Sequence, residues 1–198
     1  MSLASDAPAA GFVDADLARE ALALALPMIE AAVRRERVSG GGFLHIVMLD
    51  PTARPERVSF DQAVLLEHSV GDRERWDADY AGFARAKARL SWTHGLDSHG
   101  LQTLRPHLLR QGDSLLWGGV CLDGIVVACS GAHPWYDEAF ATAVAAAVRA
   151  LAKASSYQGC APLQATTMPS RQTPPHSRLS PWRSRWGRRV CRPWLSSP

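Results

Sequence analysis

The chain has few cysteines, no long apolar run and, toward its C-terminus, no acidic residues. The 4 cysteines among 198 residues form neither a CxxC pair nor the Cys/His spacing of a structural zinc site. We therefore expect reduced thiols and a cytoplasmic protein rather than a disulfide-stapled secreted one. No apolar run is long enough to span a membrane, and the N-terminal MSLASDAPAAGF lacks the basic and apolar regions of a secretory signal.

The missing acidic residues divide the chain into two segments of different charge. Residues 155–198 hold seven arginines and no Asp, Glu or Lys, whereas residues 1–154 hold all 19 acidic residues against 15 basic ones. The formal net charge of +3 therefore combines a basic tail with a body of net charge −4. A basic pI usually suggests nucleic acid as a partner, but here the positive charge lies outside the body, for which we expect no nucleic acid.

The tail, residues 154–198, is predicted to be disordered. It is rich in Pro, Ser, Arg, Thr and Trp and shows no period of 2 or 3.6, so it cannot bury enough surface to offset its ordering entropy. Two interpretations stay open. The composition is typical of GC-rich DNA read out of frame, which indicates a frameshifted C-terminus, and it also suits a disordered basic arm that contacts acidic partners.

Between a flexible N-terminus at 1–12 and this tail, residues 13–153 carry the patterns of one domain. Apolar periodicity near 3.6 predicts helices over 13–37, 77–92 and 134–153, and short apolar runs predict strands over 43–49, 63–68, 116–122 and 125–130. A short helix is predicted around 101–104, inside the otherwise irregular segment 93–111. Hairpin pairs with few crossovers favour an α+β fold: a mostly antiparallel sheet of four to five strands, with the long N-terminal helix and the C-terminal helix packed on it.

The sequence predicts the apolar face of the N-terminal helix and a break in it. Leu17, Leu24, Met28 and Val33 recur near helical spacing and are expected to form its apolar stripe. Pro27 lies inside the pattern and is expected to kink the helix or split it into two pieces.

The strongest local signal is Asp123-Gly124 between two apolar runs. Asp-Gly tolerates the positive φ of a type I′ turn, so it predicts a two-residue hairpin. Both flanks are apolar on both faces, which is typical of a buried sheet. Because side chains alternate along a strand, Cys121 and Cys129 point to opposite faces in this register and cannot bond to each other.

Several short patterns together resemble a known family. They are a strand ending in Asp50, an alanine-rich helix with Asp79-Tyr80 and Ala86-Lys87-Ala88-Arg89, the Gly118-Gly119-Val120 entry to the hairpin, its Asp123-Gly124 turn, and Ser130-Gly131 followed by Asp137-Glu138. In this order the chain resembles the HbpS/GlcG-like haem-binding (haem-degrading-domain) family. The resemblance implies a homo-oligomer that binds a small ligand, haem or a related tetrapyrrole, and that is not primarily an enzyme.

The histidines are the first candidates for ligand contacts. His94, His99 and His107 lie in one loop, and His133 follows the Ser-Gly turn. A neutral imidazole can be an axial haem ligand, so His94, His99 and His133 are the candidate residues, with Trp92, Leu96, Leu101 and Trp135 as the apolar wall. The alternative is that these are surface or capping histidines. His94 and His99 are not four residues apart, so they do not form a facing metal pair on a helix, and no separate metal site is expected.

Lys87 is the fourth candidate, because it lies on an otherwise apolar helix face. It suits a propionate or another ligand carboxylate, and the alternative is that its stem snorkels along the core. Ser130, His133 and Asp137 do not make a catalytic triad, because the glycine frame of a nucleophile elbow is missing. Two other functions stay open: an enzyme that uses the histidine-rich loop for acid–base work on a small organic molecule, and a structural protein without a ligand.

Overall fold

The fold is built on a four-stranded antiparallel sheet in a computed structural model, which describes residues 13–158. The strands are β1 (Leu44–Leu49), β2 (Val64–Val70), β3 (Gly119–Leu122) and β4 (Ile125–Ser130). Their order in the sheet is β2-β1-β4-β3, and every pairing is antiparallel. The predicted α+β class and the antiparallel sheet are confirmed.

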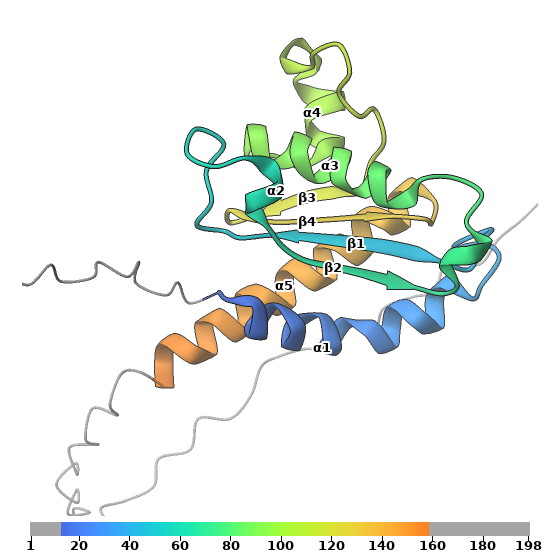
Figure 1. Ribbon diagram of the computed structural model, residues 1–198, viewed down its shortest axis with the longest axis horizontal. Coiled ribbons are helices and arrows are strands. Elements are labelled where there is room, and N and C mark those ends of the chain that lie inside the picture. Colours follow the sequence, from blue (N-terminus) through green and yellow to red (C-terminus); the bar gives the residue numbers. More distant parts are fainter. Residues whose placement is uncertain (1–12, 159–198) are drawn as a thin grey trace, which may run out of the picture. The chain divides into compact units, whose positions relative to one another are not determined.

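Helices cover both faces of this sheet. They are α1 (Ala15–Val33), α2 (Phe60–Ala63), α3 (Tyr80–His94), α4 (Ser98–Leu104) and α5 (Pro134–Gln158), with short 3-10 turns η1 (Arg73–Arg75) and η2 (Pro106–Leu108). The long helices α1 and α5 lie on one face and α3 lies on the other, with α4 beyond it (Figure 1). Within residues 13–158, no helix combines the length and apolar character needed to cross a bilayer.

Strand alternation divides the buried side chains into two cores. Ile46 and Met48 of β1 face α1 and α5, whereas Val47 and Leu49 face α3. Strands covered on both faces are mostly apolar along their whole length, and all residues of β1 and β4 are buried, including the polar His45 and Ser130. This double cover explains the unbroken apolar runs of the hairpin.

The hairpin turn forms where the sequence predicts it. Asp123 and Gly124 both have positive φ, 53° and 85°, as a type I′ turn requires, and Leu122 pairs with Ile125. Cys129 lies in the core beneath α5 and Cys121 packs on the opposite one. Both thiols are free, and the predicted opposition of the two cysteines is confirmed.

Helix α1 departs from its prediction in two ways. It runs unbroken through Pro27. Proline has no N–H to donate to the carbonyl four residues earlier, that of Ala23. Pro27 and Ala23 are both exposed, so water can reach this carbonyl. Its apolar stripe is also different, because Leu24 and Met28 are exposed. Half of the buried face is alanine, and the face packs against α5; its residues are Ala18, Ala21, Leu22, Ala25, Ile29 and Val33.

The last described helix is longer than expected. α5 continues through residues 154–158, which the sequence pattern assigned to the tail. The predicted flexible N-terminus at 1–12 and the rest of the predicted tail, from residue 159 onward, lie outside the described residues.

Candidate functional site

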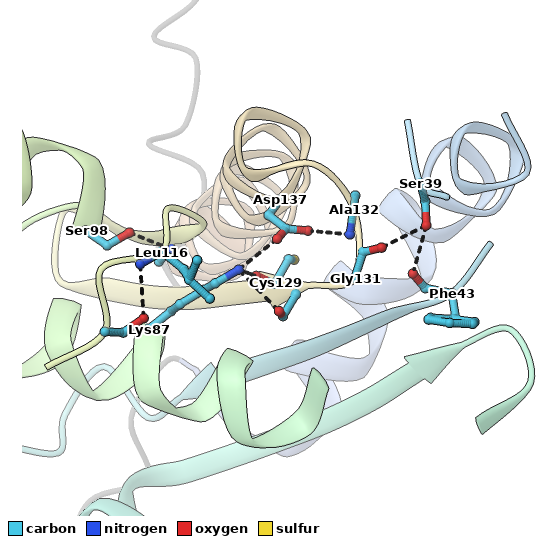
Figure 2. A network of polar contacts seen from close by, with 12 residues as sticks. Ser39, Phe43, Lys87, Ser98, Leu116, Cys129, Gly131, Ala132 and Asp137 are labelled. Atoms are coloured by element: carbon cyan, nitrogen blue, oxygen red, sulfur yellow. Dashed lines mark hydrogen bonds and ion pairs between the residues drawn. The ribbon is translucent and has the colours of Figure 1, made fainter. Parts of the chain in front are cut away.

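A buried ion pair joins the third helix to the fifth. Lys87 Nζ of α3 donates to Asp137 Oδ2 at 2.7 Å, to the Cys129 carbonyl at 2.9 Å and to Ser130 Oγ at 3.3 Å, as Figure 2 shows. Both side chains of the pair are 2% exposed. The alternative that the Lys87 stem snorkels along the core requires its ammonium to reach water, whereas the ammonium ends inside the protein against a carboxylate of the chain.

Asp137 connects this pair to the start of α5. Its second oxygen, Oδ1, accepts the backbone N–H of Ala132 at 3.0 Å. Burial raises the pKa of Asp137 to about 6, against the opposite effect of Lys87 and the hydrogen bonds. Asp137 therefore ties the loop before α5 to the first turn of the helix and carries the counter-charge that Lys87 needs.

Two glycines make room for this network. Gly118 has φ 112°, and a Cβ at this position would lie 2.6 Å from Cβ of Asp137. A Cβ on Gly119 would lie 2.6 Å from both the Lys87 carbonyl oxygen and Ser91 Oγ. The Gly-Gly entry to the hairpin is therefore required by close approach of the backbone to α3 and α5.

Helix α4 is attached to the same strand by side chains at its start. Ser98 Oγ accepts the N–H of Gly119 at 3.0 Å, and Asp97 Oδ1 accepts the N–H of Cys121 at 2.7 Å. Asp97 occupies the N-cap position of α4 but makes no cap bond, because its carboxylate is used by β3. These bonds fix α4 against the hairpin.

Residues next to this network in the chain line a hollow that we name the aromatic groove. It has a volume of about 440 Å³ and is lined by His99, Trp117, Trp135, Glu138, Ala139 and Thr142. Three of these residues are chain neighbours of the buried network: His99 follows Ser98, Trp117 precedes Gly118, and Glu138 follows Asp137. The buried bonds therefore hold the backbone that presents the groove.

Aromatic stacking and one carboxylate define the geometry of the groove. The His99 ring stacks on Trp117 with centroids 3.8 Å apart, and the His133 ring stacks on Trp135 at 5.2 Å. His99 Nδ1 lies 3.3 Å from Glu138 Oε2. The two atoms do not meet in the geometry of a hydrogen bond, so this oxygen is buried without a hydrogen-bond partner.

The structure thus brings two of the four predicted site residues together. His99 lines the groove and His133 stacks on one of its indoles. His94 lies elsewhere, at the end of α3, where it lines a cavity of about 320 Å³ together with Arg54 and Cys121. Lys87 is enclosed in the ion pair.

Of the predicted apolar wall, Trp135 lines the groove. Trp92 instead donates its indole N–H to the Ala53 carbonyl, and Leu101 is fully buried.

Sequence reasoning missed Trp117, Glu138 and the partner of Lys87. Lys87 and Asp137 lie 50 positions apart, and no local period connects them. The available signal was the charge of Lys87 on an apolar helix face, because a buried ammonium requires a carboxylate nearby. Within residues 13–158, no group of three His, Cys, Asp or Glu side chains is arranged to hold a metal ion.

Comparisons with known proteins place the chain in no family. No protein-family model matches it, and no curated protein matches it. Among solved structures it is similar to the Klebsiella pneumoniae protein ORFY, described as family-model DUF336. The two share 15% identity with a TM-score of 0.44, over 75% of this chain and 99% of that one.

Proposed function

We propose that this protein is a binding domain for a small planar ligand, which lies in the aromatic groove. The observation that carries the proposal is the groove itself, a hollow of about 440 Å³ with two indoles on its surface. Ligand sites combine apolar walls with a few polar groups, and this open groove has both. Trp135 is 58% exposed, and a flat ligand stacked on it would remove this ring from water.

Haem or a related tetrapyrrole is the first ligand that we propose to test, because the sequence resembles haem-binding proteins. His99 suits the iron. A carboxylate next to one ring nitrogen favours the tautomer with its proton there, and Glu138 lies beside Nδ1. The lone pair of Nε2 is then left for a metal, and a bound haem would supply redox or gas-binding chemistry.

The propionates of a haem find no such partner. Among the described residues that line the groove there is no lysine or arginine. Lys87, the residue predicted for this role, already donates to Asp137. The residues therefore fit the iron of a haem, and its carboxylates would have to lie in solvent.

A haem titration followed by the Soret band tests this proposal. We expect saturable binding near one haem per chain, and loss of the Soret shift in His99→Ala. His107→Ala is the matched control, because His107 does not line the groove and the variant should bind normally. A shift lost in His94→Ala and retained in His99→Ala would place the ligand in the His94 cavity and contradict the proposal.

Acid–base catalysis is a second candidate function, and the same two residues favour it. An imidazole beside a carboxylate is the arrangement of a general base, and His99 and Glu138 have it. Hydrolysis of p-nitrophenyl acetate is a simple probe: the wild-type chain should accelerate it, and the rate should fall to the uncatalysed level in His99→Ala. Equal rates for the two proteins would remove this candidate.

We also propose that the protein is a homo-oligomer and that it resides in the cytoplasm. The apolar faces of the hairpin are covered by helices of the same chain. The exposed large apolar side chains lie elsewhere, and they include Leu24 and Met28 on α1 and Leu104 and Leu115 near α4. Light scattering at micromolar concentration tests the assembly, and a monomer would contradict it.

A further inference from the structure

The charged groups that line the aromatic groove indicate which charge its ligand carries. Glu138 is the one lining residue with a full formal charge at neutral pH, and no Lys or Arg is among the described residues that line the groove. The neighbouring Asp137 adds no net charge, because Lys87 neutralises it. Apart from the titratable His99, the groove is therefore an aromatic-walled hollow with a single carboxylate.

Like the carboxylate, the aromatic walls favour a cationic ligand over an anionic one. The face of an indole is electron-rich and attracts cations more strongly than the face of any other side chain. Trp117 and Trp135 both line the groove, and Trp135 presents a ring that is 58% exposed. An anion placed here would meet the negative faces of the rings and the carboxylate together.

The carboxylate itself is incompletely satisfied. Glu138 Oε2 is buried without a hydrogen-bond partner, whereas almost all buried polar groups in proteins have one. The Glu138 side chain keeps 27% of its exposure, so a ligand in the groove can reach the carboxylate group. A positive charge on that ligand would be attracted by the carboxylate group, whose Oε2 lies beneath the surface 3.3 Å from His99 Nδ1.

We infer that the aromatic groove selects planar ligands that carry a positive charge, such as protonated nitrogen heterocycles or aryl amidines, over planar anions. The inference rests on the proposed binding function and adds the ligand's charge class to it. The ligand stacks on the indole of Trp135 and directs its cationic nitrogen toward Glu138. Haem would keep its two carboxylates in solvent, away from Glu138, and its titration is an independent measurement.

Two flat probes of opposite charge provide the test: proflavine, a cation at neutral pH, and 9-anthracenecarboxylate, an anion. Fluorescence titration of the wild-type chain should give saturable proflavine binding and weaker binding of the anion. Glu138→Gln should weaken proflavine about tenfold and reduce the difference between the probes. Glu20→Gln removes the same charge from the exposed surface of α1 and should change neither affinity.

The outcomes separate this inference from the proposed function. If both probes bind equally and Trp135→Ala weakens both, the groove is a ligand site without charge selection, and the inference is overturned while the function stands. If neither probe binds, or if Trp135→Ala changes nothing, the inference is overturned, and the haem titration decides the function. The comparison of the two probes on the wild-type chain needs no variant, so a folding defect in Glu138→Gln leaves the test intact.

Discussion

Lys87 is a charge placed inside a hydrophobic protein, and its effect on stability depends on its partner. Removing one member of a buried ion pair leaves the other charge uncompensated, which costs about 3–5 kcal/mol. Both members are 2% exposed. We therefore expect Lys87→Met to lower the free energy of unfolding by this amount in urea denaturation at neutral pH.

The control for this prediction is an ion pair on the surface. Arg149 and Asp123 are 52% and 67% exposed, and Arg149→Ala should cost about 0–1 kcal/mol. The double variant Lys87→Met/Asp137→Asn removes both buried charges and keeps an oxygen for the Ala132 N–H, so it should recover part of the loss. A double variant less stable than Lys87→Met would contradict the role of the charge pair.

The Asp137 carboxyl should titrate far above the ordinary aspartate range. Its pKa is about 6 in the folded protein against 3.8 for the free group, and burial is the main cause. The folded state holds this proton more tightly, so the contribution of Asp137 to stability is fully present below pH 3.8 and is lost as the pH rises through about 6. A ¹³C NMR titration of the carboxyl should show a midpoint near 6.

The effect of Lys87 on Asp137 provides a control for this titration. Lys87 lowers the pKa of Asp137, so in Lys87→Met the midpoint should move to a higher pH. A midpoint near 4 in the wild-type protein, or no movement in the variant, would show that the carboxyl is hydrated rather than buried.

At the scale of elements, the entry to β3 depends on a glycine that no other residue can replace. Gly118 combines φ 112° with a neighbour 2.6 Å from any added Cβ. We expect Gly118→Ala to destabilise the protein by more than about 1 kcal/mol, because strain and clash add. The melting temperature should fall accordingly.

Gly100 is the matched control for this substitution. It lies inside α4, and a Cβ there would meet nothing within 4 Å. Gly100→Ala should therefore stabilise the protein by about 0.5–1 kcal/mol through the gain in helix propensity. Equal destabilisation by both substitutions would mean that the close approach at Gly118 is not the cause.

At the scale of the whole molecule, the described buried apolar residues lie between Ala18 and Val148. A chain that ends at residue 158 should therefore melt within a few degrees of the full-length protein, as calorimetry can measure. A chain that ends at residue 147 is the contrasting variant. It loses the fully buried Val148 and should be far less stable, and a large loss already at 158 would contradict the prediction.

The sequence by itself determined the features that depend on neighbours along the chain. Asp123-Gly124 specified the hairpin turn and its register, because turn chemistry is local. The apolar runs of the hairpin predicted a buried sheet, as β4 shows, and the long helices followed from their periodicity. Even the opposition of Cys121 and Cys129 followed from strand alternation alone.

Only the tertiary structure decided which residues meet across the chain. Leu24 and Met28 fit the expected stripe of α1, yet the buried stripe is the one whose small alanines pack on α5. The pairing of Lys87 with Asp137 arises because α3 and α5 meet at the end of β4. The aromatic groove likewise joins α4, the entry to β3 and the first turns of α5. Long-range packing selects among faces that local patterns leave equivalent, so the candidate site could be located only once the fold was known.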